Sequence, residues 1–580
     1  MEYSDSALHL SADVCVIGGG MAGVCAAIAA ARHGAKVVLM QDRPVLGGNA
    51  SSEIRMWIRG AAGADNKETG ILSEIELEQI WRNPTMNPSL WDSVLYEKVK
   101  AEPNIRLLLN CACLGCETER GRISRVRGLM LNAYTYVEVE AALFADCSGD
   151  SVLGPLCGAR MLTGREDRTA FGEPDALDAP DNRVMGSSIL IQARQTDHPS
   201  AFIPPAFAYR YPTDEDLHLH AHELGASGTN FWWIEVSDRF DTLHDTGALR
   251  DELLAIAYGV WDHLKNHSGG QYDNWELEWL GFLPGKRETR RYEGPYVLRE
   301  QDLLQGTDFP DTVAYGGWTM DNHNPLGFYT EGYSSTHIQV HVPYGIPFKS
   351  LYSVNVPNLL FAGRNISATH LALSSTRVMA TCSVIGQAVG TAAALCVQLG
   401  CDPKDAPIDT LQRQLLEDGC MLPGKLRKAR AEGLCADEST LETLRNGWER
   451  PHEGASNRVL VSADTVLRMT LTPGYRRRLR LALDPDFSRE SISDEPAFRK
   501  FALRAHITRD MKPLNMPAPL LKSCAIDILS PEGRQTVLIR DNHTHLLWVD
   551  LPDGATELIL RNFRAWGGGD TGVFAIDVVE

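Results

Sequence analysis

The sequence lacks long apolar runs and an excess of positive charge. No stretch of about 18 or more apolar residues is evident, so we expect no membrane-spanning helix. Lysine and arginine number 56 against 75 aspartates and glutamates, which gives a formal net charge of -19. An acidic surface disfavours binding to nucleic acid and to anionic membranes. The opening residues show no basic segment and no cleavage-like site, so we expect no signal peptide and predict a cytoplasmic protein.

The cysteines lack the arrangement of a disulfide framework or a metal cluster. Their number, 13, is odd, and in a long chain of this kind they are expected to be free thiols. Cys111, Cys113 and Cys116 in CACLGC resemble part of a metal or iron–sulfur motif, but no partner set accompanies them. Because they follow the apolar run NIRLLL, we interpret them as packing residues of a strand and predict no metal site.

The stretch DVCVIGGGMAGVCAAIAAARHGAKVVLM predicts a dinucleotide site in a chain long enough, at 580 residues, for two to four domains. Gly18, Gly20 and Gly23 have G-x-G-x-x-G spacing between an apolar strand, 14–17, and an alanine-rich helix. A second apolar strand follows at 36–40. In such a unit the glycines permit the tight turn, the approach of a pyrophosphate and close helix–strand packing. The helix N-terminus then presents N–H groups to the phosphates.

The position after the second strand usually carries an acid that binds ribose, and here it carries Gln41. A glutamine can donate to and accept from a ribose diol, at a cost of about 1 kcal/mol relative to a carboxylate. Asp42 supplies the carboxylate if the register is shifted by one residue, so both residues stay candidates. The pair Gly47-Gly48 follows the same strand, where NAD enzymes do not usually carry two glycines.

Four separated blocks, GGGMAGVCAA, QDRPVLGGNASSEIRM, FADCSGDSVLG and NLLFAGRNISATHLALSSTRVMATCSVIGQAVGTAAAL, resemble the FAD-dependent oxidoreductase family related to glutathione-reductase and fumarate-reductase flavoproteins. The resemblance covers about residues 10–400. It implies an α/β fold in which a Rossmann-like FAD-binding domain of the glutathione-reductase type carries an inserted α+β substrate domain. It implies non-covalent FAD, because SSEIRMWIRG contains no histidine where some relatives attach the flavin. It assigns to cofactor binding Gly18, Gly20, Gly23, Gln41, Asp42, Arg43, Gly47, Gly48, Asn49, Ser51, Gly149, Asp150, Gly363 and Arg364.

Histidines and arginines are the candidates for substrate chemistry, because hydride transfer from an alcohol requires a base and groups that orient the substrate. By resemblance to fumarate-reductase relatives, His370 and Arg377 lie in a loop that contacts the substrate. His337 and His341 in STHIQVHVPYG are further candidates, since even spacing places both on one face of a strand. Each histidine can equally be structural. The charged block KRETRRYE is expected to form a buried ion-pair network, with a substrate clamp as the alternative.

The C-terminal part of the chain has a different sequence pattern. Short apolar runs such as NRVLVSA, FALRAHIT and ATELILRNF alternate with turn sequences such as SPEG, which predicts an antiparallel β-sandwich. The predicted domains are a first FAD-binding part at 1–160, a substrate domain at 161–344, a second FAD-binding part at 345–400, a helical linker at 401–452 and the β-sandwich at 453–580.

The combined patterns predict an FAD-dependent oxidoreductase that removes a hydride from a secondary alcohol, with a carbohydrate or polyol as the first substrate class. Reduction of an unsaturated carboxylate, favoured if Arg377 binds a carboxylate, and amine oxidation remain open. A flavin-containing carbohydrate-binding or assembly protein is an alternative of another class. The expected partners are a small-molecule substrate and an unidentified electron acceptor, and homo-oligomerisation stays open. We expect no nicotinamide site, because no second G-x-G-x-x-G is evident.

Overall fold

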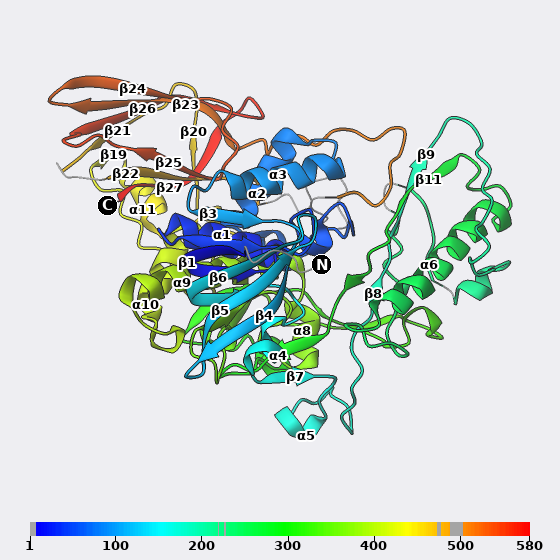
Figure 1. Cartoon of the computed structure of the whole chain (residues 1–580). Helices are drawn as coiled ribbons and strands as arrows, with labels where there is room; N and C mark the ends of the chain where they lie inside the picture. Colours follow the sequence, from blue (N-terminus) through cyan, green and yellow to red (C-terminus); the bar gives the residue numbers. More distant parts are fainter. Residues whose placement is uncertain (1–6, 219, 226–227, 473–476, 488–502, 580) are drawn as a thin grey trace. The chain divides into compact units, whose positions relative to one another are not determined.

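The computed structural model describes residues 7–218, 220–225, 228–472, 477–487 and 503–579 (Figure 1). The chain divides into two compact units, which we call the first and the second unit. The first unit consists of Met1–Ala61, Met86–Leu411 and Arg499–Lys512. The second unit consists of Ala62–Thr85, Gln412–Phe498 and Pro513–Glu580.

A seven-stranded sheet forms the centre of the first unit, with strand order β3-β2-β1-β6-β5-β4 and with β18 beside β6. Its strands are β1 (Leu8–Ile17), β2 (Val37–Met40), β3 (Ile105–Leu108), β4 (Cys111–Glu119), β5 (Arg122–Met130), β6 (Thr135–Asp146) and β18 (Leu359–Phe361). β1, β2, β3, β6 and β18 run parallel, and the pairs Ile17↔Met40, Ile17↔Asp146 and Phe361↔Asp146 bring carboxyl ends to one edge. The ends of these strands are apolar and buried, as expected when both faces of a sheet are covered. The predicted α/β fold with a Rossmann-type parallel sheet is therefore confirmed.

Two helices of the first unit, α1 (Met21–Arg32) and α9 (Met379–Leu399), pack with their backbones in contact. A Cβ at Gly386 would overlap the carbonyl oxygen of Ala22. A Cβ at Gly390 would likewise overlap a carbonyl oxygen in the next turn of α1. α9 is long and apolar enough to cross a membrane by length and composition, which the sequence analysis did not expect. However, 94% of its most apolar window is buried, as in the core helix of a folded domain.

The segment between β6 and β18 builds a second apolar core in the first unit. Its longest helix, α6 (Thr246–Asp262), continues into a π-helical turn, His263–His267, and packs against buried aromatic residues such as Trp233 and Phe328. The strands of this segment are β7 (Met161–Thr163), β8 (Ser187–Ser188), β9 (Ile191–Gln195), β10 (Glu235–Val236), β11 (Trp275–Leu280), β12 (Gly285–Lys286), β13 (Arg290–Tyr292), β14 (Thr312–Gly316), β15 (Met320–His323), β16 (Ser335–Ile338) and β17 (Tyr344–Pro347). The remaining α-helices of the first unit are α3 (Pro88–Lys100), α4 (Leu153–Cys157), α5 (Arg168–Phe171), α7 (Glu300–Gln305) and α8 (His370–Thr376).

Two antiparallel sheets make up much of the second unit (Figure 1). The five-stranded sheet contains β19 (Leu434–Cys435), β21 (Val466–Thr470), β26 (Glu557–Ala565), β23 (Leu521–Ser530) and β24 (Gly533–Ile539). The four-stranded sheet contains β20 (Val459–Val461), β27 (Thr571–Val579), β22 (Arg478–Leu483) and β25 (Leu546–Asp550). The helices here are α2 (Ile71–Arg82), α11 (Glu438–Arg445) and the end of α10 (Ile408–Glu417). The C-terminal region is β-rich, whereas its classification as a sandwich stays a prediction.

Two segments depart from the predicted domain boundaries. Residues 62–85, which include α2, belong to the second unit and not to the FAD-binding part. Residues 503–512 belong to the first unit, where the N–H of Ile507 donates to the carbonyl of Ala193 (2.8 Å). The predicted strand FALRAHIT therefore does not join the C-terminal sheets, and its first two residues, 501–502, lie outside the described residues. Pairing between segments so distant in sequence leaves no trace in local periodicity.

Candidate cofactor and substrate site

The glycine-rich turn after β1 has the geometry that a pyrophosphate site requires. Gly18 has a φ of +99°, in the left-handed region, and a Cβ there would lie 2.6 Å from the Cys147 carbonyl. A Cβ at Gly23 would overlap the Gly18 oxygen, so glycine is needed for α1 to start this close to β1. Gly20 is the N-cap of α1, and no side chain caps this helix end. Its N–H groups and positive dipole end are therefore available to an anion.

A second glycine pair lies directly against this turn. The N–H of Gly47 donates to Gly19 O (2.8 Å), and a Cβ at Gly48 would lie 3.1 Å from Gly20 Cα. Just beyond the pair, the hydroxyl of Ser51 is buried and makes no hydrogen bond with any residue that the structure describes. The two loops thus present backbone without side chains beside a buried hydroxyl that lacks a partner. Buried polar groups are normally satisfied, so this hydroxyl is suited to a bound ligand.

Gln41 is used in a way that the sequence did not predict. Its Oε1 accepts from the N–H of Gly19 (2.7 Å), its Nε2 donates to Val45 O (3.1 Å), and the residue is 2% exposed. Both ends of the amide are therefore occupied by backbone, so Gln41 shapes the glycine turn. Asp42 is exposed and lies 3.9 Å from the Arg43 guanidinium. Of the two candidate residues, Asp42 is thus the one whose side chain is exposed.

At the carboxyl ends of β6 and β18, Asp150 and Arg364 form a charge cluster with Lys286. Asp150 accepts hydrogen bonds from Arg364 (2.7 Å) and Lys286 (2.8 Å). Burial alone would raise the pKa of Asp150, but the two cations outweigh it and lower that pKa to about 2. A Cβ at Gly149 would lie 2.7 Å from the Arg364 guanidinium, and Gly363 has a φ of +113°. Arg364, which the resemblance assigns to cofactor binding, is therefore paired with Asp150, and a cofactor phosphate would compete with that carboxylate for its guanidinium.

These residues fit the FAD that the resemblance implies. A helix N-terminus without a side-chain cap, the glycines of two loops and an unsatisfied buried hydroxyl converge at the edge where the parallel strands end. Open α/β sheets bind their ligands at this edge. Asn49, the remaining predicted residue, donates from Nδ2 to Lys286 O (2.9 Å) and thereby joins the second glycine loop to β12.

Two arginines and an aspartate lie near the start of α9. Arg377 donates to the Asp321 carboxylate (3.1 Å) and to the Asp321 carbonyl (2.9 Å). The guanidinium of Arg59 lies 5.4 Å from the ring centroids of both Trp57 and Trp318, within the range of cation–π contacts. Burial lowers the pKa of Arg59 to about 10, although the charge of Asp321 opposes this shift. The guanidinium groups of Arg59 and Arg377 therefore both interact with the carboxylate of Asp321.

A buried charge network continues from Asp321 through β15. His323 lies between Asp321 (3.3 Å) and Glu235 (2.7 Å), and Glu235 also pairs with Arg287 (3.3 Å). Burial would raise the pKa of Asp321, but His323, Arg377 and His337 hold it well below its usual range. Arg287, from the block KRETRRYE, is buried in this network. The expectation of a buried ion-pair network therefore matches the contacts of Arg287.

His370 begins α8, and both of its ring nitrogens are engaged by protein groups. Nδ1 lies 2.9 Å from Glu288 Oε2, and Nε2 lies 2.9 Å from Asn322 Oδ1. The residue is 3% exposed. A histidine held in this way positions its neighbours and offers no nitrogen to a substrate. Because Asn322 precedes His323 and follows Asp321 in β15, His370 fixes the strand that carries the charge network.

His337 and His341 do not share a strand face, because β16 ends at Ile338. The prediction that both lie on one face of a strand is therefore wrong. His337 pairs across the two strands with Asp321, is half-exposed, and has Nε2 3.6 Å from the Asp321 carboxylate. His341 is exposed, with Nδ1 3.0 Å from Pro343 O. Of the two, His337 belongs to the cluster around Asp321.

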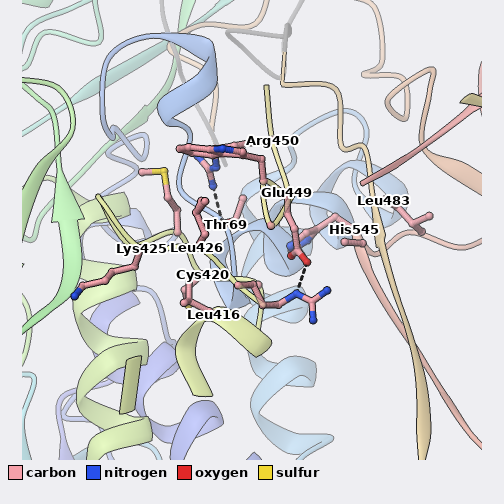
Figure 2. A pocket seen from close by; sticks show the side chains of 15 residues that line it. Thr69, Leu416, Cys420, Lys425, Leu426, Glu449, Arg450, Leu483 and His545 are labelled. Atoms are coloured by element: carbon pink, nitrogen blue, oxygen red, sulfur yellow. Dashed lines mark hydrogen bonds and ion pairs between the residues drawn. The ribbon is translucent and has the colours of Figure 1, made fainter. Parts of the chain in front are cut away.

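The second unit contains a separate small pocket of about 40 Å³ (Figure 2). Arg450 donates to the Thr69 hydroxyl (3.1 Å) at this pocket, and Arg480 donates to Glu449 (2.9 Å). Burial would raise the pKa of Glu449, but Arg480 and Arg427 lower it to about 2, while burial lowers that of His545 to about 4. The pocket has room for a few waters. Glu449 is paired with Arg427 (2.7 Å) as well as with Arg480, so these contacts are part of the packing of the second unit.

Sequence reasoning missed Arg59, Asp321 and Glu235. Each is a charged residue within or beside an apolar stretch, as in MWIRG, WTMDNH and WWIEV. Charges in such surroundings are buried only when they are paired, so their isolation in apolar sequence was a usable signal. Their mutual proximity, however, depends on the tertiary fold.

Comparison with known proteins agrees with this description. The family model for FAD dependent oxidoreductase matches residues 13–415. The fumarate reductase (cytochrome) of Shewanella frigidimarina is 56% identical over 45 residues, which is 8% of this chain and 8% of that protein. The alignment thus spans a small part of the curated relative.

Several solved structures overlap with the chain at low similarity. A geranylgeranyl bacteriochlorophyll reductase-like protein from Thermoplasma acidophilum is 14% identical with a TM-score of 0.32, covering 71% of this chain and 84% of its own. A mutant of E. coli quinol fumarate reductase FrdA is 14% identical with a TM-score of 0.28, covering 71% and 75%. The family assignment rests on the family model, which spans more than half of the chain. This chain belongs to the FAD-dependent oxidoreductase family and binds FAD.

Proposed function

We propose that this FAD-dependent oxidoreductase reduces an unsaturated carboxylate. The observation that carries the proposal is the pair of guanidiniums of Arg59 and Arg377, which both interact with Asp321 at the start of α9. Guanidinium groups bind carboxylates through paired N–H donors. The Nε of Arg377 is buried and donates to no acceptor within the described residues. Arg377 therefore retains a donor for a substrate carboxylate.

The reaction also requires polarisation of the double bond, a hydride and a proton, and the surrounding residues and FAD account for these requirements. Arg59 and Arg377 bind the carboxylate and draw electron density from the adjacent double bond, while Trp57 and Trp318 shield Arg59 from water. Bound FAD, once reduced by an electron donor, would supply the hydride for one carbon. His337 is half-exposed, so it can take a proton from solvent and deliver it to the other carbon. Hydride and proton together saturate the double bond.

The start of α9 favours the same chemistry. Val378 is the N-cap of this 21-residue helix, and no side chain caps this helix end. The N–H of Ala380 donates to Arg59 O (2.9 Å), which holds Arg59 at the start of α9. The positive end of the helix dipole stabilises an anion nearby, whether a carboxylate or a reduced, anionic flavin.

The curated relatives support the same substrate class over a short stretch. The match to fumarate reductase (cytochrome) covers 45 residues. Fumarate is an unsaturated dicarboxylate, in keeping with a site that contains two arginines. Because the match covers 8% of either chain, the substrate rests on the site geometry.

The test compares acids with their amides. Reduced protein is mixed anaerobically with unsaturated carboxylates and with the corresponding amides, and reoxidation of the flavin is followed by stopped flow. We expect the acids to react faster and Arg377→Lys to weaken their binding about tenfold or more, because lysine cannot form paired contacts. Arg194→Lys is the matched control, because Arg194 pairs with Glu278 on the surface of the same unit. Equal rates for acids and amides would contradict the proposal.

Oxidation of a secondary alcohol, for example in a carbohydrate or polyol, is the second candidate. The half-exposed His337, which lies 3.6 Å from the Asp321 carboxylate, favours it, because histidine is a suitable base for an alcohol proton. In that case sugars or polyols bleach the oxidised flavin anaerobically, and His337→Gln slows the bleaching. The two antiparallel sheets of the second unit would then be a sandwich that binds carbohydrate or mediates assembly.

A further inference from the structure

Three potential metal ligands converge beside α6 in the first unit, away from the residues assigned to FAD and substrate. They are Asp214, His222 and His263, and their ligand atoms all lie within 4.8 Å of one another. His263 Nε2 lies 3.1 Å from Asp214 Oδ1, and His222 Nε2 lies 3.8 Å from the same oxygen. The prediction of no metal site rested on the cysteines, and it did not consider these three residues.

The orientation of both imidazole rings is that of metal ligands. His263 Nδ1 lies 2.8 Å from Tyr211 O, and His222 Nδ1 lies 2.9 Å from His220 O. A carbonyl oxygen accepts hydrogen bonds only, so Nδ1 carries the hydrogen in each ring and Nε2 is left with its lone pair in the neutral form. Metal-binding histidines are oriented in this way, with the second nitrogen donating to a carbonyl or carboxylate.

His263 supplies a second, independent observation. The residue is 1% exposed, and its Nε2 makes no hydrogen bond with any described residue. A buried nitrogen that makes no hydrogen bond is costly, so its position beside the Asp214 carboxylate points to a group that is bound between them. His263 also opens a π-helical turn, His263–His267, and such turns are frequent at functional sites.

The dimensions suit a small tetrahedral cation. Zinc–nitrogen and zinc–oxygen bonds of about 2.0–2.2 Å place tetrahedral ligand atoms about 3.4 Å apart. Asp214 Oδ1 lies 3.1 Å from His263 Nε2 and 3.8 Å from His222 Nε2, so the two distances lie on either side of that value. Two imidazoles and one carboxylate form a ligand set typical of Zn²⁺, with the fourth position left for water. Asp214 is exposed, which gives the ion a route from solvent.

We propose that Asp214, His222 and His263 form a Zn²⁺ site that ties the segment after η3 (Asp214–Leu217) to the end of α6. The segment 220–230, of which the structure describes 220–225 and 228–230, has no helix or strand in its described residues. It leads to Trp232, whose carbonyl accepts a hydrogen bond from Arg287 (3.1 Å). The ion thus orders a segment that supports the buried charge network.

The experiment measures Zn²⁺ binding to the purified full-length holoprotein. Zn²⁺ is titrated in competition with a chromophoric chelator, and bound metal is counted by mass spectrometry after dialysis. His222→Gln and Asp214→Asn are chosen because both side chains are at least partly exposed, so the fold should tolerate the change. His267→Gln is the matched control, because His267 lies on the same π-helical turn and its Nε2 faces Asp262 (3.7 Å).

We expect the parent and His267→Gln each to hold one Zn²⁺. His222→Gln and Asp214→Asn should bind it at least about tenfold more weakly, since even outer-shell changes lower metal affinity 10–100-fold. X-ray absorption at the zinc edge should show nitrogen and oxygen ligands. The proposal is overturned if the parent and His222→Gln bind Zn²⁺ equally, if no Zn²⁺ is retained, or if the spectrum shows sulfur ligands from the cysteines.

Discussion

Two glycines of the β1–α1 turn allow the cofactor site to be separated from the fold. We predict that Gly20→Ala impairs FAD binding without harming the apoprotein, whereas Gly23→Ala destabilises the protein itself. Gly20 has φ -67° and ψ 179°, which alanine adopts readily, and a Cβ there would meet nothing closer than Gly48 Cα at 3.9 Å. A Cβ at Gly23 would overlap the Gly18 oxygen. The two substitutions add the same methyl group within one turn of helix.

The magnitudes follow from these surroundings. At Gly20 the free energy of unfolding should be unchanged or raised by about 0.4–1 kcal/mol, because alanine restricts the unfolded chain. The new methyl group would occupy the place where a pyrophosphate approaches the backbone. Loss of one charge-assisted hydrogen bond, about 1.5–3 kcal/mol, corresponds to an affinity for FAD that is about 10–100-fold lower. At Gly23 overpacking should cost about 1–3 kcal/mol or more of stability.

The assay uses apoprotein from which FAD has been removed. Urea unfolding gives the stability of each variant, and quenching of FAD fluorescence gives the dissociation constant. The reasoning is refuted if Gly20→Ala binds FAD as tightly as the parent, because the pyrophosphate then does not pass over this residue. It is also refuted if Gly20→Ala unfolds as readily as Gly23→Ala, since the turn would then be a packing element.

Three further predictions concern the buried charge of Asp150, the roles of His337 and His341 in turnover, and the contact of Gln41 with the glycine turn. Asp150 has a folded pKa of about 2 against an ordinary 3.8, so its ionised form should contribute about 2 kcal/mol of stability above pH ~4. That contribution should fade as the pH falls through about 2, and urea unfolding at several pH values should show that Asp150→Asn lacks this component. His337→Gln should lower turnover about 100-fold with little change in substrate affinity, while His341→Gln should leave both unchanged in steady-state kinetics. Gln41→Ala leaves the buried N–H of Gly19 unpaired, so calorimetry should show a loss of about 1–3 kcal/mol in stability.

The cofactor half of the site was predictable because its determinants are local. The spacing of Gly18, Gly20 and Gly23 and the apolar runs around them specify a strand, a turn and a helix within one short stretch. The positive φ of Gly18 and Gly47 and the close approach at Gly23 give physical reasons for these glycines. The role of Gln41 was not predictable, because a side chain that folds back onto its own turn leaves the sequence motif unchanged.

The substrate half depends on contacts between distant segments. Asp321, Arg59 and Glu235 come from separate parts of the chain, and nothing in their local sequences says that they meet. The prediction that His337 and His341 lie on one face of a strand failed because β16 stops before the second histidine, at a boundary that alternation alone does not mark. The same limit explains why α2 and residues 503–512 were assigned to the wrong parts of the chain.

The most direct test of the whole account is an anaerobic visible spectrum of the purified protein, first reduced and then mixed with an unsaturated carboxylate. The account predicts an oxidised flavin band near ~450 nm that bleaches on reduction and returns when the acid is added. If no band is present and added FAD does not bind, the assignment of the cofactor site is contradicted. If the band bleaches and oxygen restores it but no unsaturated acid does, the proposed reaction is contradicted.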